Sequence, residues 1–270
     1  MSKPLPTIAF FGATGGCALH CLVLALQAGY HCNALTSYSP RKIVVRTPTK
    51  LTDLLITHDI PSTTITTNLH IIPGNATDTT AVRFTLLTPD TNAPVSLIIT
   101  GIGSRLKFES LLHPTLENPT ICQDAMSTLL EALHSLPNPQ GTQKPRLVVI
   151  SGTGVDAKRD VPYLMLPLFN WMLRVPHADK RVMEGMVLAE TDSQSPAIEN
   201  FMIVRPSLLV DGVGSGGLEK VRVGTAEEPA IGYVISRGEV GRWVFENAVA
   251  GLEVKGEGKR YWGQFVTLTN

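Results

Sequence analysis

Short runs of β-branched and aliphatic residues alternate along the chain with longer stretches of helical pattern. The five clearest runs span residues 8–11, 70–72, 95–100, 147–151 and 201–204. Each run is apolar throughout and does not alternate with polar residues, which is typical of strands whose two faces are both covered. The pattern therefore predicts an α/β fold in which helices cover both faces of a parallel sheet.

Three helices have recognisable ends in the sequence. Residues 16–28 are apolar on nearly every side and stop at Gly29, which predicts a helix buried against the sheet. Asn118, followed by a proline, predicts the start of another helix with Asn118 as its N-cap. The spacing from Ser236 to Glu239 matches a capping box and predicts the start of a third helix.

The length of 270 residues is compatible with one large domain, and no repeat or low-complexity segment divides the chain. Residues 211–230 are rich in glycine and show little periodicity, so we expect a loop or a small cap there rather than a second domain. The sequence thus predicts a single domain over residues 1–270, with cap elements at about 163–180 and 211–238.

Charge and composition argue against several classes of function. Lys and Arg number 23, as do Asp and Glu, and this balance leaves no electrostatic footprint for nucleic acid or an anionic membrane. The longest apolar run falls short of the roughly 20 residues that cross a bilayer, so we expect a soluble protein without a membrane partner. Cysteines form no C-x-x-C pair and no zinc spacing, which predicts reduced thiols, no metal site and a cytoplasmic protein.

The strongest local signal is a glycine-rich turn directly after the first apolar run. Gly12 can form the tight turn, Gly15 lets the backbone approach a pyrophosphate, and Ala18 is small enough for the next helix to pack closely against the strand. Free N–H groups at the start of that helix favour an anion. Strand, turn and helix together predict the binding of a dinucleotide.

The spacing G-x-x-G-x-x-A, with Gly-Ala-Thr-Gly in the turn, resembles the atypical short-chain dehydrogenase/reductase proteins, in particular the NmrA-like and biliverdin-reductase-B-like group. Five further segments resemble that family in the same order along the chain, namely residues 46–51, 74–78, 98–103, 149–154 and 203–206. The resemblance implies a Rossmann fold, that is, a doubly wound parallel sheet, with a small C-terminal cap on the substrate side. It also implies that the cofactor-binding residues are Gly12, Thr14, Gly15, Gly16, Cys17, Arg46, Lys50, Asn75, Thr100, Gly101, Ile102, Gly103 and Ser151.

The charge after the second strand indicates which cofactor is bound. NAD recognition usually places an acid there, whereas the 2′-phosphate of NADP requires Arg or Lys. No acid occurs in this segment as far as Lys50, and four cations do. We therefore expect NADP(H), bound through Arg46 and Lys50. The segment is longer than the family pattern, so Arg41 and Lys42 are the alternative phosphate partners if the second strand ends at Ser37.

The catalytic tyrosine of ordinary short-chain dehydrogenases is absent. Those enzymes carry Tyr-x-x-x-Lys on the helix after the fifth strand, where the lysine lowers the pKa of the tyrosine. Lys180 matches the lysine of that helix, but the residue four positions before it is Pro176. The motif formed by Tyr38 and Lys42 follows the second strand and is read as a coincidence. The NmrA-like group includes members that sense the cofactor without turning it over, and biliverdin-reductase-like members rely on a serine after the fifth strand.

Four residues are therefore the catalytic candidates. Ser151 follows the fifth strand and is expected to orient the substrate or the nicotinamide, and Lys180 is expected to bind the nicotinamide ribose. His177 is a candidate proton donor, although a helix-start or surface role is the alternative. Tyr163 is a candidate replacement acid, with core packing as its alternative.

Two other features of this region have plainer interpretations. Asp179 and Glu184 are expected to stabilise the N-terminal turns of their own helix. The apolar stripe over residues 164–173 is expected to pack in the core, with an apolar substrate pocket as the alternative.

Three hypotheses of function follow. The preferred one is an NADPH-dependent oxidoreductase that acts on a small, apolar carbonyl or conjugated substrate. The second is an NmrA-like sensor that binds NADP(H) and regulates a protein partner without chemistry, and the third is a non-redox isomerase or cyclase on the same fold.

Overall fold

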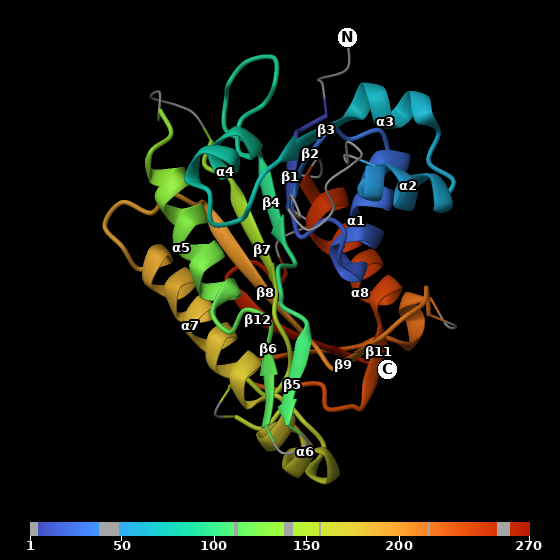
Figure 1. The fold of residues 1–270 in the computed structure, drawn as a ribbon, viewed down its shortest axis with the longest axis vertical. Coiled ribbons are helices and arrows are strands. Elements are labelled where there is room, and N and C mark those ends of the chain that lie inside the picture. The colour runs from blue at the N-terminus through green and yellow to red at the C-terminus, as the bar shows by residue number, and fades with distance from the viewer. Residues whose placement is uncertain are drawn as a thin grey trace.

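An eight-stranded sheet forms the centre of the molecule in a computed structural model that describes residues 5–37, 49–110, 113–137, 143–156, 158–214, 217–252 and 260–270 (Figure 1). Its strand order is β10-β12-β8-β7-β4-β1-β2-β3. These strands are β1 (Ile8–Phe11), β2 (Cys32–Thr36), β3 (Leu69–Pro73), β4 (Leu97–Thr100), β7 (Arg146–Ile150), β8 (Asn200–Pro206), β10 (Arg222–Thr225) and β12 (Gln264–Thr269). Two smaller sheets pair β5 (Leu106–Ser110) with β6 (His113–Leu116), and β9 (Leu208–Val210) with β11 (Val234–Ser236).

Among the described strands, every pairing within the large sheet is parallel except that of β10 with β12. The five strands predicted from apolar runs are all present, with ends shifted by a few residues. The chain runs from β1 outward to β2 and β3 and then returns to β4 on the other side of β1. Open α/β sheets bind ligands outside the carboxyl ends of the strands at such a reversal, so a ligand site is expected at the carboxyl ends of β1 and β4.

Helices cover both faces of the sheet (Figure 1). One layer contains α1 (Gly16–Gln27), α2 (Thr49–Thr57), α3 (Ser62–Asn68) and α8 (Arg237–Val244). The other contains α4 (Thr79–Thr85), α5 (Ile121–His134) and α7 (Arg174–Thr191), while α6 (Leu166–Met172) lies beyond the sheet. Successive residues of β1 point to opposite layers, since Ile8 and Phe10 belong to the core under α1 whereas Ala9 and Phe11 belong to the core under α5. The predicted doubly wound α/β fold is confirmed.

Two of the three predicted helix ends are confirmed, and one is wrong. Gly29 follows α1 with a φ of +84°, and the capping box of α8 is formed, because Glu239 N–H donates to Ser236 Oγ at 3.0 Å and Ser236 N–H donates to the Glu239 carboxylate at 3.0 Å. Asn118 is not an N-cap, because α5 begins only after Thr120. Asn118 Oδ1 instead accepts the backbone N–H of Thr120 at 3.2 Å, which closes a turn before the helix.

Residues 211–230 contain more regular structure than the glycine content predicts. Arg222–Thr225 form β10, an edge strand of the large sheet that runs antiparallel to β12. Part of the segment expected as a substrate-side cap therefore belongs to the main sheet. The other cap segment, residues 163–180, contains a short 3-10 helix (Tyr163–Met165), α6 and the start of α7. The interpretation of the whole chain as one domain with a cap stays a prediction.

Candidate functional site

The glycine turn, residues 12–16, is built for close approach of a ligand to the backbone. Gly12 has a φ of +75°, and a Cβ atom there would lie 2.9 Å from the carbonyl carbon and oxygen of Gly101, which follows β4. Gly15 N–H donates to Gly12 O at 2.8 Å and closes the turn. Gly15 is also the N-cap of α1 and provides no side-chain cap, and the first turn of α1 carries no acid. The N–H groups at this helix end are therefore open to an anion.

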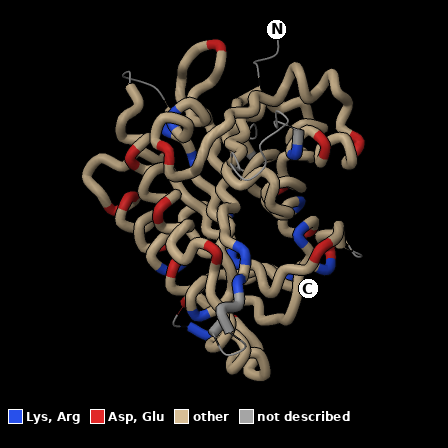
Figure 2. The backbone as a smooth tube through the Cα atoms, viewed as in Figure 1, with Lys and Arg blue, Asp and Glu red and all other residues tan. Residues whose placement is uncertain are grey.

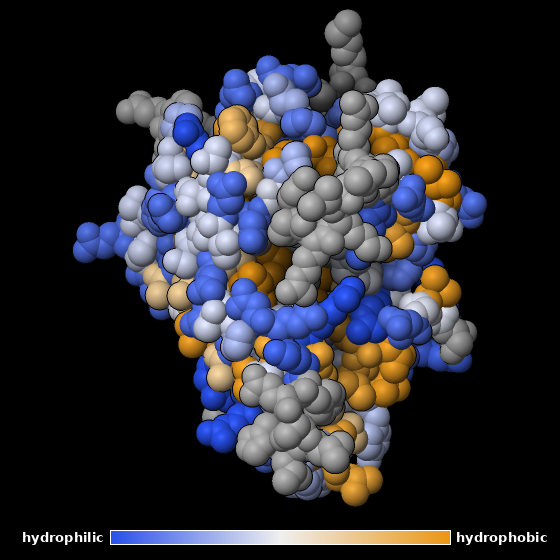
Figure 3. Space-filling model, in the orientation of Figure 1, coloured by the Kyte–Doolittle hydropathy of each residue, from blue (hydrophilic) through white to orange (hydrophobic). Residues whose placement is uncertain are grey.

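Two cavities meet at the glycine turn and share Gly15, Gly101, Ile102 and Gly103. The first, which we name the glycine-loop cavity, has a volume of about 380 Å³, and its other lining residues are Gly12, Thr14, Leu35, Ser37, Lys50, Gly74, Asn75, Ala76, Arg105 and Ile121. The second, which we name the apolar cavity, has a volume of about 360 Å³ and contains the side chains of Leu106, Leu116, Phe169, Leu173, Leu208 and Leu209. Figure 3 shows apolar residues inside a hollow near the centre of the face.

Most of the predicted cofactor-binding residues line these cavities. Gly12, Thr14, Lys50 and Asn75 line the glycine-loop cavity, and the residues from Gly15 to Cys17 line the apolar cavity. Gly101, Ile102 and Gly103 line both, and Ser151 lines the apolar cavity. Thr100 is buried at the end of β4 and lines neither cavity. Arg46, together with the alternatives Arg41 and Lys42, lies outside the described residues.

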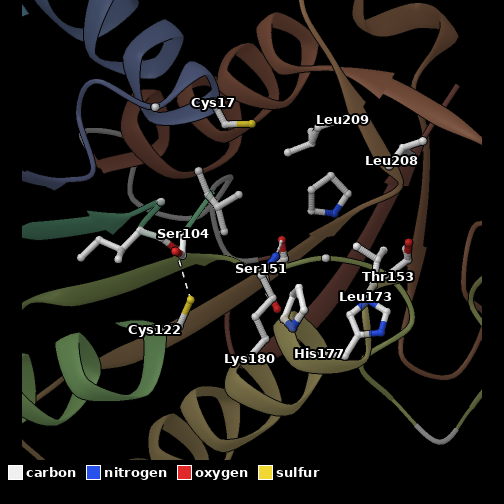
Figure 4. A pocket seen from close by; sticks show the side chains of 18 of the residues that line it. Cys17, Ser104, Cys122, Ser151, Thr153, Leu173, His177, Lys180, Leu208 and Leu209 are labelled. Carbon is white, nitrogen blue, oxygen red and sulfur yellow. Dashed lines mark hydrogen bonds between the residues drawn. The ribbon is translucent and has the colours of Figure 1, made fainter. Parts of the chain in front are cut away.

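Ser151 and Lys180 form the polar floor of the apolar cavity (Figure 4). The backbone N–H of Ser151 donates to Val204 O at 2.7 Å, which fixes the residue at the end of β7. Lys180 Nζ, from α7, donates to the Ser151 carbonyl at 2.8 Å, and burial lowers the pKa of this ammonium group. Ser151 is 2% exposed, and its Oγ has no hydrogen-bond partner within the part of the chain that the structure describes. A buried hydroxyl without a partner is costly, which points to a ligand that supplies one.

His177 lies beside this floor. Its ring centroid is 5.8 Å from that of Phe169, and it lines the apolar cavity (Figure 4). Burial, together with the charges of Lys180 and Arg181, lowers the pKa of His177 to about 4, against a smaller opposite effect of its hydrogen bond with the Thr153 backbone. The imidazole is therefore neutral near pH 7, and it can hold a proton on one ring nitrogen but is not an imidazolium acid.

Tyr163 lines neither cavity. Its side chain is 73% exposed, and the guanidinium of Arg159 lies 4.0 Å from its ring centroid. The expectation that the stripe over residues 164–173 packs in the core is correct for Phe169, which is 4% exposed, but wrong for Leu164, which is 80% exposed. Phe169 and Leu173 line the apolar cavity as well, so the stripe contributes to its wall.

The expectation that Asp179 and Glu184 stabilise their own helix is wrong. Asp179 accepts the backbone N–H groups of Cys122 and Gln123 at 2.9 Å each and so caps the start of α5 from α7. Glu184 pairs with Arg205 through two hydrogen bonds of 3.1 and 2.6 Å, and both residues are buried. These two carboxylates are committed to structural partners, and the only acid lining the apolar cavity along the described chain is the capping residue Asp179.

Two arginines that the sequence reasoning did not single out line the cavities. Arg105, at the end of the loop after β4, lines the glycine-loop cavity, and Arg237, the first residue of α8, lines the apolar cavity. Arg105 could have been found from the sequence, because it is a cation two residues after the predicted cofactor-binding segment Gly101–Gly103. Figure 2 shows that positive and negative residues are otherwise interspersed along the chain, on both sides of the sheet.

Neither a metal centre nor a membrane span is found where the structure can be described. Within those ranges, no three His, Cys, Asp or Glu side chains come together in a way that could hold a metal ion. No helix of the described chain is both long and apolar enough to cross a bilayer. The four cysteines are free and buried.

Comparison with known proteins gives two relatives at high identity. Over their whole length, the chain is 46% identical to reductase pytE of Aspergillus terreus, with 100% of each chain covered. It is 43% identical to oxidase pynE of Aspergillus niger, with 100% of this chain and 99% of that protein covered. No family model matches the chain.

Solved structures of lower identity share the fold. The anaerobilin reductase ChuY of Escherichia coli O157:H7 is 17% identical with a TM-score of 0.59, covering 97% of this chain and 96% of that one. A Streptococcus pneumoniae protein assigned as an NADH-flavin reductase is 15% identical with a TM-score of 0.58, covering 98% and 99% of the two chains. These likenesses agree with the Rossmann-like architecture described above.

Proposed function

The chain belongs to the atypical short-chain dehydrogenase/reductase-like family that includes the two Aspergillus proteins, and from this membership we propose that it is an NADPH-dependent oxidoreductase acting on a small, apolar carbonyl or conjugated substrate. The observation that carries the proposal is the buried Ser151 Oγ, which has no hydrogen-bond partner among the described residues and lies in a mostly apolar cavity that adjoins an open glycine turn.

The glycine turn fits a nicotinamide dinucleotide. A Cβ atom at Gly12 would meet the Gly101 backbone, and one at Gly15 would lie 3.1 Å from Gly12 O, so only glycines leave this surface bare. The open N–H groups of α1 favour the pyrophosphate, and Asn75 lines the same glycine-loop cavity. When bound, the cofactor supplies or accepts a hydride.

The charges around the glycine-loop cavity support NADP(H) over NAD(H). Lys50 and Arg105 both line this cavity, and none of its described lining residues is Asp or Glu. A 2′-phosphate requires cations, whereas the 2′-hydroxyl of NAD is usually held by an acid. Arg46 stays a further expected phosphate ligand.

The floor of the apolar cavity supports the chemistry proposed for the substrate. Ser151 Oγ would donate a hydrogen bond to the acceptor oxygen of the substrate and so orient it. Lys180 holds the Ser151 carbonyl and places a positive charge at the same place, which stabilises negative charge that develops on that oxygen. Leu106, Phe169 and Leu209 would contact the apolar body of the substrate and keep water away.

Calorimetric titration with NADPH and NADH tests the cofactor assignment. We expect NADPH to bind more tightly, and the double substitution Lys50→Ala, Arg105→Ala to weaken NADPH about tenfold or more while changing NADH little, because the lost contacts are charge-assisted. Lys107→Ala is the matched control, because Lys107 is an exposed cation two residues from Arg105 that lines neither cavity. If neither nucleotide binds, the proposed function is wrong.

Turnover tests the enzyme assignment against the sensor. Pro176 takes the place of the usual tyrosine, which favours an NmrA-like sensor as the second candidate. NADPH oxidation is measured with a panel of apolar aldehydes, ketones and enones. An oxidoreductase turns over at least one class and loses rate in Ser151→Ala with unchanged NADPH affinity. Stoichiometric cofactor binding without turnover of any class would favour the sensor.

A further inference from the structure

Arg237 occupies a place next to the glycine turn that the proposed function has not used. It is the first residue of α8, and its side chain crosses over Gly16, the first residue of α1. A Cβ atom at position 16 would lie 3.0 Å from Arg237 Cβ and 3.1 Å from its Cγ, and still closer to its Cδ. Glycine at position 16 therefore makes room for this side chain, and the same contact holds the arginine beside the open end of α1.

The guanidinium of Arg237 forms an ion pair that contributes little free energy. Its Nη1 donates to Asp211 Oδ1 at 2.7 Å, but the Asp211 side chain is 96% exposed. Solvent-exposed ion pairs contribute little free energy, because water and salt screen them. The Arg237 side chain is itself 32% exposed and lines the apolar cavity with Gly15, Gly16 and Cys17. It can change partner at low cost.

A ligand with negative charge can bind both the open N–H groups of α1 and the guanidinium of Arg237. The N–H groups of α1 have no side-chain cap, and a guanidinium forms paired hydrogen bonds with phosphate oxygens. In the same cavity no described residue forms a hydrogen bond with the buried Ser151 Oγ, which indicates independently that the cavity takes a polar ligand. We propose that Arg237 exchanges Asp211 for the pyrophosphate of the nicotinamide cofactor and closes over it from the side of α8. This inference rests on the cofactor binding proposed above.

The proposal predicts a loss that is the same for both nucleotides, because the pyrophosphate is common to NADPH and NADH. Arg237→Gln keeps the length of the side chain and removes its charge, and we expect it to raise both dissociation constants on the order of tenfold with their ratio unchanged. Arg237→Lys should recover part of the affinity. Adenosine 2′-monophosphate has no pyrophosphate, so its binding should not respond to Arg237→Gln although it should weaken in the Lys50→Ala, Arg105→Ala variant.

Arg242→Gln is the matched control, because Arg242 is an exposed arginine on the same helix and lines neither cavity. Each variant is checked by thermal unfolding, and Arg237→Lys keeps the test valid if Arg237→Gln does not fold. Wild-type affinities in both Arg237 variants would overturn the proposal and leave the proposed function intact. An effect only on the KM of an anionic substrate would overturn it in favour of a substrate-binding role. Failure of the wild type to bind either nucleotide would overturn both.

Discussion

The buried imidazole of His177 makes the stability of the fold depend on pH in a specific direction. Burial first, and then the charges of Lys180 and Arg181, lower the pKa of His177 from 6.5 in the unfolded chain to about 4 in the folded protein. Between these two pKa values, the His177 ring binds a proton in the unfolded state but not in the folded state. Stability from this residue is fully present above pH 6.5 and is lost as the pH falls from 6.5 towards 4.

The size of the effect follows from the two pKa values. Between pH 7.5 and pH 5, a shift of this size reduces the free energy of unfolding by about 2 kcal/mol. Part of the ring lines the cavity, where solvent screens its charge, so the smallest reduction in the free energy of unfolding that we expect is about 1 kcal/mol. Urea unfolding of the wild type and of His177→Gln at pH 7.5, 6 and 5 measures it, since glutamine does not titrate. The difference in stability between the two proteins should change by 1 to 2 kcal/mol across this range.

His70→Gln is the control, because it makes the same substitution at an exposed residue of β3 that lines neither cavity. Parallel pH dependence of the wild type and His177→Gln would refute the reasoning. The result also bears on function. A histidine that stays neutral to pH 5 cannot act as an imidazolium acid near neutrality, which agrees with our proposal that Ser151 Oγ and Lys180 Nζ serve the substrate oxygen.

Three further predictions concern packing. Glu184→Gln should lower the free energy of unfolding in urea by about 2 kcal/mol, because the amide keeps one acceptor for the buried Arg205 guanidinium but removes the charge and the second acceptor; a loss below about 1 kcal/mol would contradict this. Asp179→Ala should speed amide hydrogen exchange at the start of α5 and lower the free energy of unfolding by about 1–2 kcal/mol, and unchanged exchange of Cys122 and Gln123 would contradict this. Gly241→Val should lower the unfolding temperature by several degrees, because a Cβ atom there meets the Cys17 carbonyl oxygen of α1 at 2.6 Å, and an unchanged temperature would contradict this contact.

The fold was predictable where the signal is local or strongly apolar. The strands near β1 are buried on both faces, so their residues are apolar throughout and stand out in the sequence. β10 is an edge strand and contains Arg222 and Gly224, and β12 beside it begins with Gln264 and ends on threonines, so neither strand shows that pattern. The prediction of Asn118 as an N-cap was wrong because the same side chain can close a turn or cap a helix, and the sequence does not distinguish the two.

The candidate site was predictable in its backbone and less so in its side-chain partners. Gly12 and Gly15 are required by a turn of a few residues, so the sequence contains the whole constraint. The partner of Asp179 is the start of α5, 57 residues away from it along the chain, and only the packing of α7 on α5 brings the two together. Arg237 could not be predicted as a site residue. The capping box accounts for Ser236 and Glu239 but does not determine the direction of the arginine side chain between them.

The two cavities take most of their lining residues from different parts of the chain, which bears on substrate specificity. The glycine turn, Lys50, Asn75 and the Gly101–Gly103 segment come from the first part of the chain and surround the glycine-loop cavity. Phe169, Leu173, Leu208 and Leu209 come from later elements and surround the apolar cavity. Among the described residues the two cavities share only Gly15 and the Gly101–Gly103 segment, so we expect that side chains of α6 and β9 can change with little effect on the contacts proposed for the cofactor. We therefore expect relatives that share the first half of the site to differ in substrate where their residues of the later half differ, and a comparison of those residues with measured substrate preference tests this.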